Sequence, residues 1–171
     1  YIINDMIEEA TVLNKKIDFN WSPNRMKEEH TKMTREIMAE EIKHMQDEKL
    51  EWLDELEEFT PAGFTLLKSA IDVFQEGTAM KHCLYTGYYN FIKGKRYLAY
   101  SVDVDGERAT VGYYIYPDAN KRFVFNQCYG IGNSQVSDTL KSIVLNFEDT
   151  LNSITKQFSF TKKSSYELVQ E

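Results

Sequence analysis

The spacing of apolar residues predicts one long helix in the first third of the chain. Between Pro23 and Phe59 there is no glycine and no further proline, and apolar residues recur three, four or seven positions apart. The stripe consists of Met38, Ile42, Met45, Trp52, Leu56 and Phe59. This period is typical of one face of an amphipathic helix. We expect the stripe to pack on the protein's own core, and the alternative is a coiled coil with a partner helix.

Two shorter helices are predicted next, from their capping residues. Ser69-x-x-Asp72 is typical of a capping box that opens a helix of one or two turns, which ends at Gly77. Thr78 is expected to cap a second helix, from about residue 79 to 92, that ends at Gly94.

The period then changes from helical to two, which predicts strands. Alternating or β-branched and aromatic residues occupy 97–104, 110–116 and 122–128. Asp105-Gly106 is a hairpin signal, so these segments should form an antiparallel three-stranded meander. The segment 64–67 is a further candidate strand.

The last strong pattern is a closing amphipathic helix that should cover one face of the sheet. Its apolar residues are Val136, Leu140, Ile143, Phe147, Leu151 and Ile154, three or four positions apart. The predicted fold class is therefore α+β: an N-terminal long helix, then a helix, the meander and a C-terminal amphipathic helix. We expect a helical region over 1–60, an α+β domain over 61–160 and a polar tail over 161–171.

Size and charge narrow the class of protein. A chain of 171 residues with 42% hydrophobic residues suits one compact core. Its formal charge of -7 opposes broad electrostatic capture of phosphate, so we expect no direct binding of duplex DNA and no membrane partner. The first residue is Tyr1 and not methionine, which favours a piece of a longer protein.

The cysteines and histidines predict neither a metal nor a cofactor. Cys83 and Cys128 are far from any Cys-x-x-Cys spacing, and His30 and His44 lie fourteen positions apart, outside the spacing of a helical metal pair. We therefore expect both histidines on the surface and the protein in the reducing cytoplasm. The sequence has no apolar run of bilayer length and no signal-peptide core.

Chemistry-bearing residues concentrate between Gly77 and Asn133. His82 and Cys83 fall near the start of the helix that Thr78 should cap, where free N–H groups and the helix dipole favour a thiolate. A nucleophilic Cys83 is one interpretation, and an inert buried thiol is the other.

A buried amide is predicted on the third strand. Phe123, Phe125 and Gln127 alternate and should share one face of the sheet. If the helix that carries His82 covers this face, an imidazole–amide pair would satisfy both groups and orient a ligand. The alternative is an ordinary polar network in the core.

A glycine-containing loop precedes the closing helix. Gly130-Ile131-Gly132-Asn133 permits close approach of the backbone, and N–H groups at a helix start can hold a phosphate or carboxylate. The alternative is that the glycines only make the turn and that Asn133 or Ser134 caps the helix.

Together these residues resemble the PcfJ-like protein family. The family pattern is carried over roughly 63–150 by Gly77, Met80, His82, Cys83, Leu84, Gly94, Ala109-Thr110, Gln127, Gly130 and Asn133. The aromatic residue that the family has one turn after the cysteine is here Tyr85 or Tyr88. The resemblance implies a protein of conjugative plasmids, integrative elements or phages, in a family named for an accessory factor that works with a relaxase at the transfer origin. It brings no established enzymatic activity.

Two functions follow as expectations. The first is an accessory or interaction module of a mobile genetic element, with a relaxase or another nucleic-acid-processing protein as partner. The second is a small ligand-binding domain or a hydrolase- or transferase-like enzyme, with a catalytic group of His82, Cys83 and Gln127. Its ligand-binding residues would be Gly130, Gly132, Asn133 and Thr110. A cysteine protease of the papain kind is disfavoured because no histidine follows His82.

Overall fold

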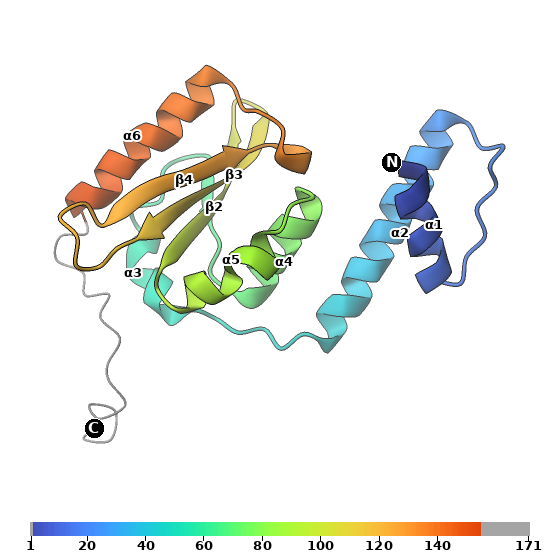
Figure 1. Cartoon of the computed structure of the whole chain (residues 1–171), viewed down its shortest axis with the longest axis horizontal. Coiled ribbons are helices and arrows are strands. Elements are labelled where there is room, and N and C mark those ends of the chain that lie inside the picture. Colours follow the sequence, from blue (N-terminus) through green and yellow to red (C-terminus); the bar gives the residue numbers. More distant parts are fainter. Residues whose placement is uncertain (1, 155–171) are drawn as a thin grey trace. The chain divides into compact units, whose positions relative to one another are not determined.

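The computed structural model describes residues 2–154, which form two compact units (Figure 1). The chain divides into Tyr1–Asp47 and Glu48–Glu171, and we describe each unit by itself. The expected polar tail at 161–171 lies outside the described residues.

The first unit is a pair of helices, α1 (Ile2–Val12) and α2 (Pro23–His44). Ser22 caps α2 by accepting a hydrogen bond from the Arg25 N–H at 3.3 Å, and Pro23 occupies the first turn, where its missing N–H has no cost. The small core between the helices consists of Met6, Ala10 and Met33, with Leu13, Ile17, Trp21 and Met26 around it.

One residue of α2 corrects a sequence prediction. His30 is buried, with 8% of its surface exposed, and its Nδ1 lies 2.9 Å from Glu9 Oε2 of α1. Thr34 donates to the other carboxylate oxygen of Glu9 at 2.7 Å. The prediction of a surface His30 was wrong because α1 covers this face of α2. His44 is exposed, as expected.

The single long helix predicted from Pro23 to Phe59 is also wrong. Helix α2 ends at His44, and the later apolar residues lie in or beside a 3-10 turn, η1 (Glu51–Leu53), and the short helix α3 (Asp54–Glu57). The chain between them runs extended, because the Leu50 N–H donates to Lys68 O at 2.8 Å and the Ala70 N–H donates to Glu48 O at 2.9 Å. Pairing with a distant segment here overrides the helical period.

The second unit is built on an antiparallel sheet with strand order β1-β2-β3-β4. The strands are β1 (Phe64–Leu66), β2 (Tyr97–Val104), β3 (Glu107–Ile115) and β4 (Phe123–Tyr129). The meander of β2, β3 and β4 is confirmed, and β1 adds a fourth strand to the three predicted. The hairpin turn is where the sequence places it, since Asp105 and Gly106 have φ of 51° and 80°.

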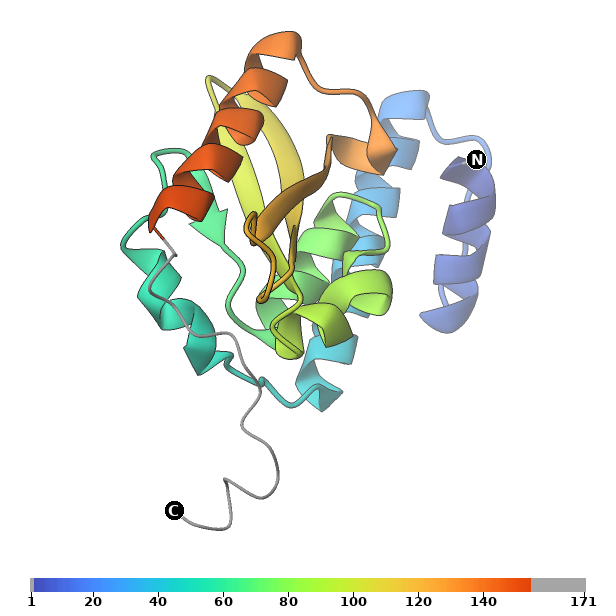
Figure 2. The same ribbon diagram turned by 60° about the vertical axis from the view of Figure 1, so that its left-hand side comes forward.

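Helices cover both faces of this sheet (Figures 1 and 2). On one face lie α4 (Ala70–Ala79) and α5 (Leu84–Lys93), and on the other lies α6 (Asp138–Ile154). Ser69 caps α4 as predicted, by accepting from the Asp72 N–H at 3.1 Å.

The boundary between α4 and α5 differs from the prediction. Helix α4 continues through Gly77, and Thr78 donates to the Phe74 carbonyl at 3.0 Å from inside this helix. Thr78 therefore does not cap α5, which begins at Leu84. A threonine hydroxyl that bonds the carbonyl four residues back is satisfied within its own helix.

The core under α6 is aromatic. Phe147 meets the ring of Tyr100 edge-on with centroids 5.3 Å apart, and the ring of Tyr113 at 6.0 Å. The Tyr113 hydroxyl donates to Val144 O at 2.7 Å. The expectation that the closing helix covers one sheet face is thus confirmed.

Helix α6 also protects the open edge of β4. The Asn152 side chain bonds both backbone groups of Phe123, each at 2.8 Å, and the Phe125 N–H donates to the Glu148 carboxylate at 2.5 Å. Backbone groups that would otherwise be free to pair with another strand are occupied. Within residues 2–154, no helix combines the length and the apolar character needed to cross a bilayer.

Candidate ligand pocket

A pocket of about 370 Å³ lies between the sheet and the start of α5. Its walls come from the turn before α5, from α5 itself, from β4 and from the segment after β4. They consist of His82, Cys83, Leu84, Tyr88, Gln127, Tyr129, Asn133 and Gln135. Four residues named from the sequence therefore share one cavity: His82, Cys83, Gln127 and Asn133. Thr110, Gly130 and Gly132 are not among its walls.

His82 lies in the tight turn between α4 and α5. The turn closes through the His82 N–H, which donates to Gly77 O at 3.0 Å. A Cβ at Gly77 would lie 3.1 Å from the His82 carbonyl oxygen, so glycine allows this close approach.

The surroundings of the His82 ring disfavour its protonated form. Burial lowers its pKa below the ordinary 6.5, while the charge of Glu76 opposes this effect. The Nε2 atom is shut off from solvent and bonds to no group in the described part of the chain. The expected imidazole–amide pair is therefore not formed through Nε2.

Cys83 occupies the position that precedes α5, and its side chain makes no capping bond. Its thiol is exposed, unlike that of Cys128, whose pKa burial raises to about 12. The expectation of a buried Cys83 thiol is thus wrong. Cys83 and His82 both line the pocket, and within residues 2–154 no hydrogen bond joins the thiol to the imidazole Nε2.

Gln127 reaches the pocket because β4 contains a bulge. Gly112 pairs with Gln127 while Tyr113 pairs with Phe125, which leaves Asn126 without a partner position on β3. Side chains normally alternate along a strand, and an extra residue shifts this alternation. The predicted common face for Phe123, Phe125 and Gln127 is therefore wrong.

The two sides of the bulge point to different helices. Phe125 stays with Tyr113, 6.1 Å between ring centroids, on the face that α6 covers. Asn126 Nδ2 donates to the Tyr97 hydroxyl at 2.9 Å, and Gln127 lines the pocket with Tyr88 of α5. The bulge thus delivers two amides to the α5 face.

The loop after β4 is not the start of α6, contrary to the sequence interpretation. It forms a short 3-10 turn, η2 (Ile131–Asn133), whose Gly132 N–H donates to Met80 O at 2.8 Å. The Gly130 N–H donates to Ser134 O at 2.9 Å. These two donors are occupied within the protein and do not face an anion.

Helix α6 is capped further along the chain. Ser137 Oγ accepts from the Leu140 N–H at 3.1 Å, so neither Asn133 nor Ser134 caps the helix. Asn133 instead has a left-handed backbone, with φ of 61°, and its side chain lines the pocket. Asparagine tolerates this conformation better than most residues.

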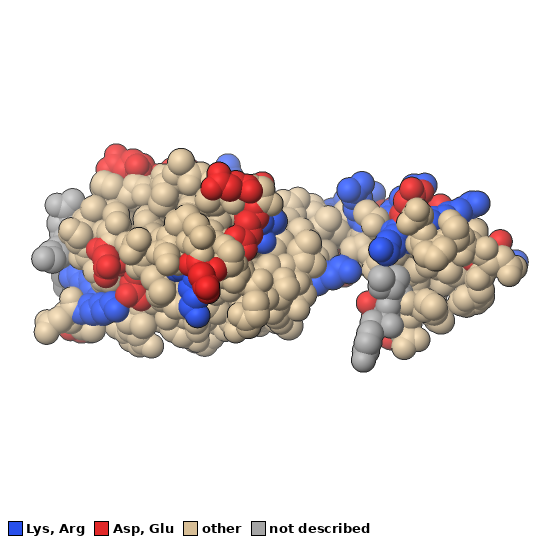
Figure 3. Space-filling view, turned by 90° about the horizontal axis from the view of Figure 1, so that it is seen from above, with Lys and Arg blue, Asp and Glu red and all other residues tan. Residues whose placement is uncertain are grey.

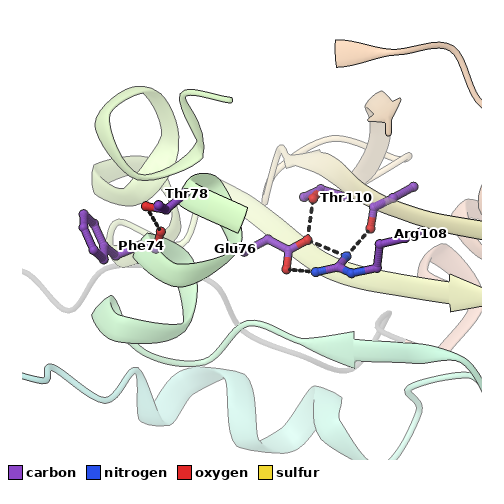
Figure 4. Close-up of polar contacts among 6 residues, drawn as sticks. Phe74, Glu76, Thr78, Arg108 and Thr110 are labelled. Carbon is purple, nitrogen blue, oxygen red and sulfur yellow. Dashed lines mark hydrogen bonds and ion pairs between the residues drawn. The ribbon is translucent and has the colours of Figure 1, made fainter. Parts of the chain in front are cut away.

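An ion pair that was not predicted from the sequence joins the buried Glu76 to Arg108 (Figure 4), and the charges of both residues act on His82. Glu76, 5% exposed, accepts from Arg108 at 2.8 and 2.6 Å and from Thr110 Oγ1 at 2.5 Å. Thr110 thus serves α4–β3 packing in this structure. A signal was present, because Glu76 follows Val73 by three positions on the apolar side of α4, where an unpaired carboxylate would be unfavourable.

Three other pocket residues were not predicted as part of a site. Tyr88 was named only as a candidate for the aromatic residue that the family has one turn after the cysteine, and Tyr129 and Gln135 were not predicted. Tyr129 lies on a strand and Gln135 in an irregular segment, so neither belongs to a motif that signals a site. Tyr129 and Gln135 come close to His82 only in the folded chain.

Comparison with known proteins gives one match. The family model described as PcfJ-like protein matches residues 2–144, a longer span than the motifs alone suggest. No curated protein and no solved structure matches the chain. Because the match covers most of the sequence, the chain belongs to the PcfJ-like protein family.

Proposed function

We propose that this chain is an accessory protein of a mobile genetic element, a conjugative plasmid or a phage, and that it works through protein contacts with DNA-processing proteins. Membership of the PcfJ-like family over residues 2–144 is the observation that carries the proposal. The partner is a relaxase or another nucleic-acid-processing protein.

The charge of the chain favours protein contacts over direct capture of duplex DNA. Its formal charge is -7, and groups of Asp and Glu side chains share the face in Figure 3 with groups of Lys and Arg. Tight non-specific binding of DNA comes from cationic side chains that neutralise phosphates. Mixed charges suit the polar rim of a protein interface better.

The test is transfer of the native element with and without the protein. We expect its deletion to lower transfer frequency and the wild-type protein to restore it. We also expect the purified chain to bind the relaxase of that element while it leaves a non-cognate relaxase unbound. Wild-type transfer without the protein, or salt-sensitive binding to duplex DNA with none to the relaxase, would refute the proposal.

A second candidate is a ligand-binding or catalytic site in the pocket. It is favoured by the exposed Cys83 thiol and the His82 ring, which line the same cavity as Gln127 and Asn133. In this function His82 acts as acid and base, Cys83 as nucleophile or pocket wall, and Gln127 and Asn133 position the ligand. We expect His82→Gln and Cys83→Ser to lower transfer, while the exposed His44→Gln does not.

A further inference from the structure

We propose that the pocket binds an uncharged, planar ligand whose edge carries hydrogen-bond donors and acceptors, the chemical class of a nucleobase presented as a nucleoside. The inference rests on the second candidate function, since it names a ligand class for the same pocket. Three properties of the walls carry it: their charge, their amides and their aromatic rings.

The walls are uncharged. The eight lining residues include no Asp, Glu, Lys or Arg, and burial keeps the His82 ring neutral. A charged ligand would leave water without gaining a counter-charge, and that desolvation is unfavourable. A phosphate or carboxylate group therefore belongs outside the pocket.

The walls present three side-chain amides: Gln127 on β4, Asn133 in η2 and Gln135 after it. Each amide carries a donor and an acceptor side by side. Asparagine and glutamine use this pair to recognise the edge of a base, which offers the complementary pair. Three such groups around one cavity favour a ligand with several donor and acceptor positions in one plane.

The remaining walls suit a flat ring. Tyr88 and Tyr129 contribute aromatic surface and Leu84 contributes apolar surface. Tyr88 is fixed by stacking on Tyr97, with ring centroids 4.5 Å apart, and the Tyr97 hydroxyl accepts from Asn126. A ring that is already held in place loses little freedom when a base contacts it. The volume of about 370 Å³ is in the range of small-molecule sites.

The experiment is a titration of the full chain with adenosine, guanosine, cytidine and uridine, followed by NMR. We expect saturable shifts of pocket resonances for at least one nucleoside. The matching 5′-monophosphate should bind no more tightly. Because Cys83 is exposed in the pocket, the bound nucleoside should also slow its alkylation by iodoacetamide.

Two variants test the amides. Gln127→Leu keeps the approximate size and removes the amide, and we expect it to weaken binding about tenfold or more. Asn133→Gly removes the amide while it preserves the left-handed backbone, and it should weaken binding in the same direction. The control is Gln75→Leu, at an exposed position of α4. Urea unfolding of each variant verifies that it is folded.

The inference is overturned if none of the four nucleosides binds, if Gln127→Leu binds as tightly as wild type, or if a glutamine dipeptide amide binds more tightly than every nucleoside. If no nucleoside binds but the His82 and Gln127 variants still lower transfer, the ligand class is wrong and the proposed role of the pocket in transfer is supported. Binding of a nucleoside with unchanged transfer in these variants would support the ligand class and refute the role of the pocket in transfer.

Discussion

Glu76 is a buried carboxylate whose two oxygens are both engaged by Arg108. Replacing it by glutamine removes the charge and leaves the Arg108 guanidinium, about one third exposed, without its partner. We expect Glu76→Gln to lower the free energy of unfolding by about 2 kcal/mol, less than for a fully buried pair because water reaches Arg108. Urea unfolding measures this change.

The control is Glu40→Gln, because Glu40 forms an exposed ion pair with Lys43 within one helix. Exposed pairs of this kind contribute little to stability. A loss of stability at Glu40 equal to that at Glu76 would show that burial of the Glu76 pair does not matter.

His82 gives the protein a pH dependence. Burial lowers its pKa in the folded state below 6.5, so the unfolded chain binds this proton more tightly. The His82 contribution is therefore constant above about pH 6.5, and stability falls as the pH drops below that value.

The measurement is urea unfolding between about pH 7.5 and pH 5 for wild type and His82→Gln. We expect the wild type to lose more stability than the variant as the pH falls over this range. Only the wild type has an imidazole at position 82 that binds a proton more tightly in the unfolded chain. Parallel curves for the two proteins would show that the folded state does not disfavour the protonated ring.

Two glycines on the α5 side of the sheet should respond to alanine in opposite directions. A Cβ at Gly112 would lie 1.8 Å from the hydroxyl oxygen of buried Tyr97, so Gly112→Ala should destabilise by about 2 kcal/mol or more. A Cβ at Gly87, within α5, would meet nothing closer than 4.0 Å. Gly87→Ala should therefore stabilise the helix by about 0.5 to 1 kcal/mol. Thermal unfolding of both variants measures the two signs.

At the scale of the element, α6 contacts the sheet through polar side chains as well as through its apolar face. Asn152 substitutes for a neighbouring strand at Phe123. We expect Asn152→Ala to lower stability by about 1 to 3 kcal/mol and to speed amide hydrogen exchange at Phe123. Asn146→Ala, exposed on the same helix, is the matched control. Unchanged exchange at Phe123 in Asn152→Ala would contradict this role of Asn152.

Most elements could be predicted from local chemistry, and the failures differ in their causes. Ser69, Asp105 and Gly106 act through neighbours in sequence, and their predicted roles hold. The break after His44 depends on a partner that the local pattern does not reveal, whereas α4 continues past Gly77 with Thr78 bonded to Phe74 inside the same helix. The first is fixed by Lys68 and Ser69, which pair with the chain at Glu48 to Leu50.

At the scale of the whole molecule, each compact unit has its own core. In the first unit, the buried apolar residues among the described positions 3–47 are Met6, Ala10 and Met33. A small core gives little stability, so we expect this unit to unfold at a lower urea concentration than Glu48–Glu171.

The two tryptophans allow a direct measurement, because Trp21 lies in the first unit and Trp52 in the second. Trp52→Phe leaves fluorescence from Trp21 alone, and Trp21→Phe leaves that from Trp52. We expect the Trp21 signal to change at the lower urea concentration. Coincident transitions would instead indicate a single cooperative unit.

The candidate pocket was predictable in its main residues but not in its construction. His82 and Cys83 were predicted at a helix start, Asn133 in a loop and Gln127 on the third strand, and all four line the cavity. The predicted sheet face of Gln127 was wrong, because the alternating sequence pattern does not reveal the bulge at Asn126. Glu76 and Arg108 are far apart in sequence, so their pairing depends on α4 packing against β3.

The bulge also determines which mutations can reshape this protein during evolution. Substitutions at the cavity walls change one group at a time and leave the others in place. Insertion of a single residue into β3 between Gly112 and Tyr113 would give Asn126 a partner, restore regular pairing and place Gln127 on the same face of the sheet as Phe125. The chemistry of the cavity is thus more sensitive to a change in chain length at this point than to the identity of any one of its walls.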